Sequence, residues 1–221
     1  MHFFYLHGFA SSPRSGKAMF FRDRLAARGW PLDCLDLNLP DFASLTVSRM
    51  IGQLDSAIER RPPGPVVLIG SSLGGFAALH AAARRHDRPG GDRPVIRLIL
   101  LAPALDFASD RDTQFDAAEL DEWRLRGERE VEHYGYGRKE KIGFGLYTDG
   151  RRYDSTSVRL DVPILLLQGS RDDVVSPAAA VEFAATRPGV TLRMLDDDHQ
   201  LQGHREELWK ESAAFLGLDA S

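Results

Sequence analysis

The fold is decided by residues 66–75, which read VVLIGSSLGG. Four apolar residues form a short strand-like run, and the Ala-rich segment after Leu73 is typical of a helix. A Gly-x-Ser-x-Gly pattern between a strand and a helix indicates a nucleophile elbow, a strained turn that lifts the serine above the end of its strand. A phosphate-cradling loop and a plain turn are the alternatives for five such residues. The flanking strand and helix favour the elbow, so the pattern predicts Ser72 as a nucleophile.

The rest of the chain alternates short apolar runs with segments of helical spacing. Several runs are continuously apolar, which indicates strands buried on both faces, as in a parallel sheet. The expected strands span residues 2–6, 32–37, 65–69, 95–101, 162–168 and 190–195. The expected helices span residues 15–28, 45–60, 73–85, 178–186 and 205–216. This alternation predicts an α/β fold with a mostly parallel central sheet of about six strands flanked by helices.

Length and composition limit the class of protein. The 221 residues suit a single domain over residues 1–221, and a net charge of −4 disfavours a dedicated nucleic-acid binder. Cys34 is the only cysteine, which excludes an intramolecular disulfide and any Cys-based metal site and fits a cytoplasmic location. The sequence shows no signal peptide and no apolar run near the ~20 residues of a membrane span.

One connection is too long to be a loop. Sixty residues separate the strand ending at Leu101 from the strand starting at Val162, and we expect residues 106–158 to form an inserted cap. Apolar spacing predicts a helical face there, formed by Leu120, Trp123, Gly127, Val131 and Tyr134. A short hairpin is expected from residues 141–147 and 151–153, because the Asp-Gly between them suits a tight turn. Residues 88–92 are expected to form a simple loop.

Stabilisation of an oxyanion requires two backbone N–H donors. One follows the nucleophile, which here is Leu73, and the other comes from the loop after an early strand, commonly opened by His-Gly. Residues 5–9 read YLHGF, so Phe9 is the expected second donor. His7 is then expected to bond within the loop instead of acting as a base.

The general base is expected late in the chain, because this fold orders its triad as Ser, Asp or Glu, then His. His199 follows the last expected strand and is preferred to His204, which is expected to begin the last helix. For the acid, Asp172 follows the preceding strand and would orient and stabilise the imidazole. Asp173 and Asp106 remain alternatives for this position.

These residues resemble the YqiA/YcfP-like family of small bacterial α/β-hydrolases, which are serine esterases. The resemblance rests on YLHGFASSPRSGKA at residues 5–18, on IGSSLGG at residues 69–75, and on the segments around Asp172 and His199. It implies a small Ser-Asp-His esterase or thioesterase. The cap region matches the family less well, and substrate choice is expected to depend on it.

The expected function is therefore hydrolysis of a small-molecule carboxylic ester or thioester through an acyl-enzyme on Ser72. No phosphate loop or metal-ligand spacing is found in the sequence, so no cofactor and no metal are expected. A peptidase or amidase of the same fold and a non-catalytic binding protein on a hydrolase scaffold are the alternatives. The acyl group, the leaving group and the oligomeric state do not follow from the sequence.

Overall fold

A six-stranded parallel sheet forms the centre of the computed structural model, which describes residues 1–86, 91–112 and 114–218. The strand order is β2-β1-β3-β4-β7-β8, and all five neighbouring pairs are parallel. The predicted six-stranded parallel sheet is thus confirmed. The loop predicted at residues 88–92 lies mostly outside the described residues. The strands are β1 (His2–Leu6), β2 (Leu32–Leu35), β3 (Val66–Ser71), β4 (Val95–Leu101), β7 (Ile164–Gly169) and β8 (Val190–Leu195).

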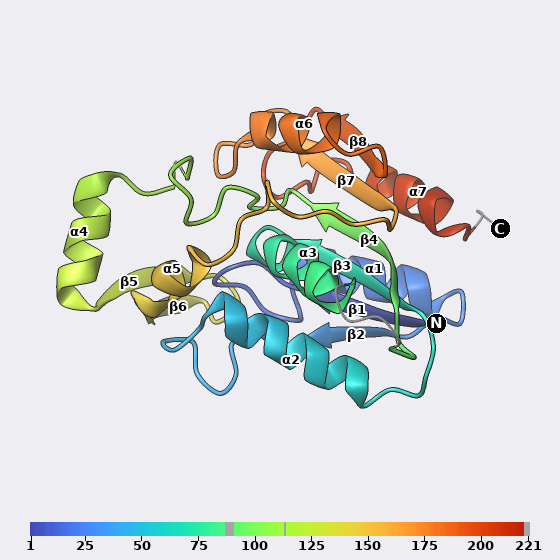
Figure 1. The fold of residues 1–221 in the computed structure, drawn as a ribbon, viewed down its shortest axis with the longest axis horizontal. Coiled ribbons are helices and arrows are strands. Elements are labelled where there is room, and N and C mark those ends of the chain that lie inside the picture. Colours follow the sequence, from blue (N-terminus) through green and yellow to red (C-terminus); the bar gives the residue numbers. More distant parts are fainter. Residues whose placement is uncertain (87–90, 113, 219–221) are drawn as a thin grey trace.

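Helices cover both faces of this sheet (Figure 1). Helix α1 packs against α7 on one face, and α2 packs against α3 on the other, while α6 contacts β7 and β8. Burial of the strands on both faces explains their continuous apolar runs, because every residue of the central strand β3 is buried. The helices are α1 (Gly16–Ala26), α2 (Val47–Glu59), α3 (Leu73–His86), α6 (Pro177–Ala185) and α7 (Arg205–Leu216).

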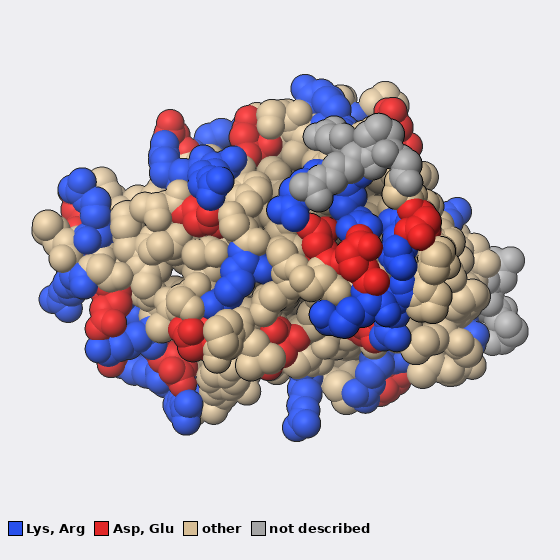
Figure 2. All heavy atoms as spheres, turned by 60° about the horizontal axis from the view of Figure 1, so that its bottom comes forward, with Lys and Arg blue, Asp and Glu red and all other residues tan. Residues whose placement is uncertain are grey.

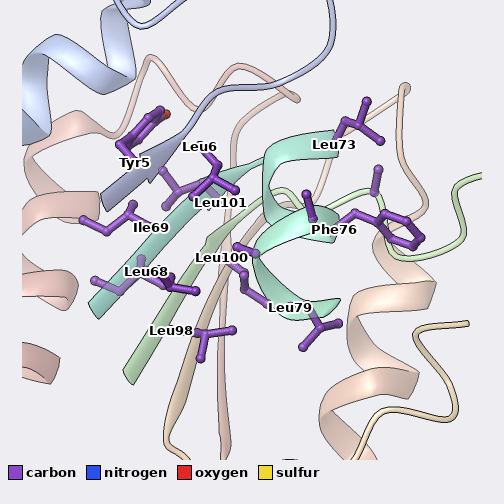
Figure 3. Packing of buried hydrophobic residues seen from close by; sticks show 14 of the residues in the cluster. Tyr5, Leu6, Leu68, Ile69, Leu73, Phe76, Leu79, Leu98, Leu100 and Leu101 are labelled. Atoms are coloured by element: carbon purple, nitrogen blue, oxygen red, sulfur yellow. The ribbon is translucent and has the colours of Figure 1, made fainter. Parts of the chain in front are cut away.

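The core that fixes the elbow lies between α3 and the middle strands (Figure 3). Phe76 and Leu79 on α3 are fully buried with Leu68 of β3 and with Leu98 and Leu100 of β4. Complete burial of such side chains stabilises the fold by about 1.5–3 kcal/mol each. The first turn of α3 is therefore held rigidly at the end of β3.

The segment between β4 and β7 forms its own small unit beyond the carboxyl ends of the strands (Figure 1). It contains α4 (Ala117–Arg126), the antiparallel hairpin β5 (Glu128–His133) and β6 (Arg138–Gly143), and the short helix α5 (Gly145–Gly150). The single long helical face predicted here is wrong beyond residue 126. Gly127 ends α4 in the left-handed conformation, with φ of 72°, and Val131 lies in a strand.

The predicted position of the hairpin is also wrong. Residues 145–150, which include the Asp-Gly turn signal, form α5, and Asp149 at its end accepts hydrogen bonds from the backbone and side chain of Ser48 on α2. The hairpin lies earlier and turns through residues 134–137. A tertiary contact to α2 thus replaces the local turn preference of Asp-Gly.

Charged side chains of both signs are interleaved on the face shown in Figure 2. Many charged side chains of the described residues form ion pairs, as in the contacts of Arg85 with Asp55 and Glu59 and of Arg61 with Asp33. Across residues 1–86, 91–112 and 114–218, no helix is both long and apolar enough to cross a membrane.

Candidate active site

Ser72 occupies a strained turn between β3 and α3. Its φ is +53°, in the left-handed region that a non-glycine residue adopts at a cost on the order of 1–3 kcal/mol. The backbone on both sides holds this conformation, because the N–H of Ser72 donates to Leu101 O at 3.0 Å and its carbonyl accepts from Gly75 and Phe76. The structure thus has the local geometry expected of a nucleophile elbow.

Two glycines make this turn sterically possible. A Cβ on Gly70 would lie 2.5 Å from Gly74 O, and a Cβ on Gly74 would lie 2.2 Å from Leu6 O. Real Cβ atoms do not approach backbone so closely, and the backbone here has no room to move. The glycines therefore let the first turn of α3 pack directly against the end of β1, which brings Leu73 close to the loop after that strand.

Ser72, His199 and Asp172 form one hydrogen-bonded chain. The hydroxyl of Ser72 lies 3.1 Å from Nε2 of His199, and Nδ1 of His199 lies 2.9 Å from Oδ2 of Asp172. Ser72 follows β3, Asp172 follows β7 and His199 follows β8, so all three meet at the carboxyl edge of the sheet. Both His199 and Asp172 are 8% exposed, which keeps their contact largely free of competing water.

Asp172 is held as an ionised acceptor. Burial disfavours its charge, but hydrogen bonds from His199 and from the N–H groups of Val174 and Val175 outweigh that effect and lower its pKa below the usual value. Gln168 donates a further hydrogen bond to Oδ2 at 2.8 Å. With Asp172 ionised, the Nδ1 of His199 carries the proton, and Nε2 is free to accept one from Ser72.

The alternative residues are placed elsewhere. Asp173 is exposed, and Asp106 lies 3.6 Å from the guanidinium of Arg111. His204 stands at the N-cap of α7, as expected, and its Nδ1 lies 3.1 Å from Asp197. Of the residues considered for base and acid, the structure therefore brings His199 and Asp172 to Ser72.

The two expected oxyanion donors are the chain neighbours of Ser72 and of Gly8. These two residues lie close together, because a Cβ on Gly8 would lie 3.2 Å from Ser72 Cβ. Leu73 begins α3, and Phe9 lies in the oxyanion loop, defined here as residues 7–12. Within the described part of the chain, no carbonyl or side chain accepts from the N–H of Leu73 or of Phe9. Both N–H groups therefore have no acceptor among the described residues.

His7 is a structural residue of the oxyanion loop. Its Nδ1 donates to Gly8 O at 2.8 Å, and its Nε2 accepts from the N–H of Leu37 at 3.1 Å. Burial lowers the pKa of His7, which keeps the ring neutral and able to accept at Nε2. Asn38 also anchors this loop, because its Nδ2 donates to Ser11 O at 2.8 Å.

Three supporting residues, Gln168, Asn38 and Lys17, were not predicted from the sequence. Gln168 had a signal, since it is the one polar side chain in the buried run ILLLQ of β7. Lys17 on α1 donates from Nζ to the carbonyl of His199 at 3.3 Å, 182 residues away in sequence. Among the described residues, no group of three or more His, Cys, Asp or Glu side chains could hold a metal.

Comparison with protein families and curated sequences gives a consistent set of relatives. The model of one family, described as "Uncharacterised protein family (UPF0227)", matches residues 2–216. Mouse palmitoyl-protein thioesterase ABHD10, mitochondrial, is 29% identical over 152 residues, covering 65% of this chain and 48% of that protein. Lipase LipV of Mycobacterium tuberculosis is 35% identical over 72 residues, covering 33% of this chain and 25% of the lipase. The chain thus spans about half the length of the thioesterase relative.

Solved structures show the same fold. A protein from Agrobacterium vitis superposes with a TM-score of 0.84 at 24% identity, over 96% of this chain and 86% of the other. Mouse alpha/beta hydrolase domain-containing protein 10 gives 0.78 at 22% identity, over 99% and 90%. Est1E from Butyrivibrio proteoclasticus, with ferulic acid bound, gives 0.78 at 19% identity, over 97% and 87%. The chain therefore has the α/β-hydrolase fold.

Proposed function

This chain belongs to the uncharacterised protein family UPF0227, and from that premise we propose that it is a serine hydrolase of carboxylic esters or thioesters. The observation that carries the proposal is the chain of contacts from Ser72 Oγ to His199 Nε2 at 3.1 Å and from His199 Nδ1 to Asp172 at 2.9 Å. The names of the thioesterase and lipase relatives support the same reaction class. Membership also agrees with the resemblance found in the sequence motifs.

The reaction starts with proton transfer from Ser72 to His199. As Oγ attacks the substrate carbonyl carbon, its proton passes to Nε2, and the imidazolium that forms is stabilised by ionised Asp172. The carbonyl oxygen gains the negative charge, and the N–H groups of Phe9 and Leu73 donate hydrogen bonds to it. Removing one such donor typically costs about 10²–10³ in kcat, so these two groups supply a large part of the catalysis.

The second half of the reaction reverses the proton path. His199 returns its proton to the departing alcohol or thiol, which leaves the acyl group on Ser72. Water then gives a proton to Nε2 as it attacks the acyl carbonyl, and collapse of this second intermediate releases the acid and restores the Ser72 hydroxyl. The same groups act in both halves, so no cofactor is required.

We further propose that residues 106–158 act as a cap that contacts the acyl group. The segment lies beyond the carboxyl ends of the strands, where Ser72, Asp172 and His199 meet (Figure 1). Ligands of open α/β sheets bind at this edge. Differences in acyl preference between relatives are then expected to follow differences in this segment.

A fluorophosphonate probe combined with a substrate panel tests the proposed function. Folded protein is expected to react covalently at Ser72 and to hydrolyse nitrophenyl esters of graded chain length or the corresponding acyl-thioesters. Ser72→Ala is the matched control and should neither label nor turn over. A folded wild-type protein that fails to label would instead favour a non-catalytic binding protein, whereas labelling with turnover of amides alone would favour an amidase.

A further inference from the structure

The tip of the β5–β6 hairpin, residues 134–137, packs directly against the oxyanion loop. The N–H of Gly135 donates to Ala10 O at 3.2 Å. A Cβ on Gly135 would lie 2.8 Å from the carbonyl carbon of Ser11 and 2.8 Å from the Cβ of Ser12, so the two backbones are in direct contact. Ala10 has a φ of +49°, a conformation that a non-glycine residue keeps only under outside support.

A second contact reaches Phe9 through aromatic rings. His133, the last residue of β5, is fully buried and meets the Phe42 ring edge-to-face at 4.6 Å between centroids. The Phe42 ring lies 5.4 Å from the ring of Phe9. Contacts of this kind add about 0.5–1.5 kcal/mol beyond area burial. The hairpin therefore contacts the backbone of the oxyanion loop directly and is linked to the donor residue Phe9 through the ring of Phe42.

The opposite side of the loop is already fixed. His7 and Asn38 bind it to the segment after β2, as described above, and the hairpin tip adds a separate contact at residues 10–12. Because an oxyanion donor works only at a fixed place, a shift of 1 Å can cost on the order of 10²-fold in rate. Contacts from both the segment after β2 and the hairpin tip would hold the Phe9 N–H at such a fixed place.

We propose that the hairpin tip and His133 position the oxyanion loop, so that the inserted segment holds the Phe9 N–H where the substrate oxygen becomes negative. Gly135 and His133 are positioning residues, because Gly135 touches the loop directly and His133 acts on it through Phe42. The inference rests on the proposed serine hydrolase function. It assigns the insert a role in the rate of the chemical step in addition to acyl selection.

Gly135→Ala tests the backbone contact. The added methyl must displace the Ser11–Ser12 backbone, and kcat is expected to fall by about 10- to 100-fold while KM changes much less. Gly145→Ala is the matched control in the same insert, because no described atom lies within 4 Å of its Cβ position and its φ is not positive. Gly145→Ala should retain wild-type kcat. A folded Gly135→Ala protein with kcat within twofold of wild type would overturn the proposal.

The preference for an ester over its thionoester isolates the oxyanion contact. A thionoester carries sulfur in place of the carbonyl oxygen and is a poorer partner for N–H donors, so displaced donors should reduce the ester-to-thionoester ratio of kcat/KM at least about fivefold. A variant that merely contains less folded protein would lose both rates equally and keep the ratio. An unchanged ester-to-thionoester ratio in Gly135→Ala would therefore contradict the proposal that the hairpin positions the Phe9 N–H.

If Gly135→Ala does not fold, His133→Ala decides the question. This change removes the ring that contacts Phe42 and adds no atoms, so it is expected to lower the ester-to-thionoester ratio of kcat/KM. His133→Phe keeps a ring at this position and is expected to lower that ratio less. An unaltered ratio in His133→Ala would refute the inference. A wild-type protein that hydrolyses neither substrate would refute the proposed function itself, which keeps the two failures apart.

Discussion

Replacement of Lys17 by methionine is expected to stabilise the protein at neutral pH. The Lys17 side chain is partly buried on α1, where its Nζ donates to His199 O at 3.3 Å. Burial lowers the pKa of Lys17 from 10.5 to about 8, and it does so against the attraction of three nearby carboxylates, Asp172, Asp198 and Asp197, while Arg205 adds repulsion. The folded protein thus carries an ammonium in a place that disfavours its charge.

The magnitude follows from the shift in pKa. The lowering of the Lys17 pKa from 10.5 to about 8 corresponds to at most about 3.5 kcal/mol of destabilisation when Lys17 is charged. The lost hydrogen bond to His199 O offsets about 1 kcal/mol of the gain. Lys17→Met should therefore raise the free energy of unfolding at pH 7 by about 2 kcal/mol.

The effect of pH has a definite sign. Between about pH 8 and 10.5 the folded protein has released the Lys17 proton while the unfolded chain still binds it, so wild-type stability gains from this group as pH rises. Lys17→Met lacks that gain. The advantage of the variant is thus full below about pH 8 and should disappear by about pH 10.

Urea denaturation of both proteins at a series of pH values measures this difference directly. Lys210→Met, which removes an exposed lysine on α7, controls for loss of charge alone and should show no comparable pH dependence. A Lys17→Met protein that is less stable than wild type at pH 7, or whose advantage does not change with pH, would refute the reasoning.

Three further predictions concern the contacts around Ser72. Asp172→Asn should lower kcat by on the order of 10³- to 10⁴-fold in steady-state ester hydrolysis, and Asp173→Asn should change it little; equal effects would remove Asp172 from the triad. His199→Ala should abolish most activity in the same assay while His204→Ala retains it, and the reverse result would reassign the base. Gly74→Ala, whose Cβ would lie 2.2 Å from Leu6 O, should cost at least about 2 kcal/mol in the free energy of unfolding, and a near-neutral effect would contradict the close packing of the elbow.

The sheet and the positions of the main site residues were predictable for a common reason. Buried parallel strands carry continuous apolar runs, and functional side chains of this fold directly follow the strands. Ser72, Asp172 and His199 each stand within four residues of the end of a strand, so identifying the strands placed all three at one edge. The sequence favours Asp172 but leaves Asp173 open, and in the structure Asp172 is buried beside His199 while Asp173 is exposed.

The insert was predicted poorly because its signals are local and ambiguous. Gly127 fits the helical spacing, yet it adopts a left-handed conformation and ends α4. The Asp-Gly pair suggested a turn, but Asp149 binds Ser48 on a distant helix. Gly135 and Gly137 in the sequence YGYG were the better turn signal.

The supporting contacts could not be predicted because they join distant residues. Lys17 and His199 are 182 positions apart, and Asn38 is 27 positions from Ser11. Hydrogen bonds of this kind depend on how α1, β2 and the loop after β8 are arranged in space. No spacing within a single segment encodes that arrangement.

The central claim is that Ser72 carries the acyl group during turnover, and mass spectrometry of the protein quenched during hydrolysis of a nitrophenyl ester tests it most directly. The account predicts one acyl adduct per chain, located on the peptide that contains Ser72 and absent from Ser72→Ala. Turnover by Ser72→Ala, or an adduct located on another residue, would contradict it.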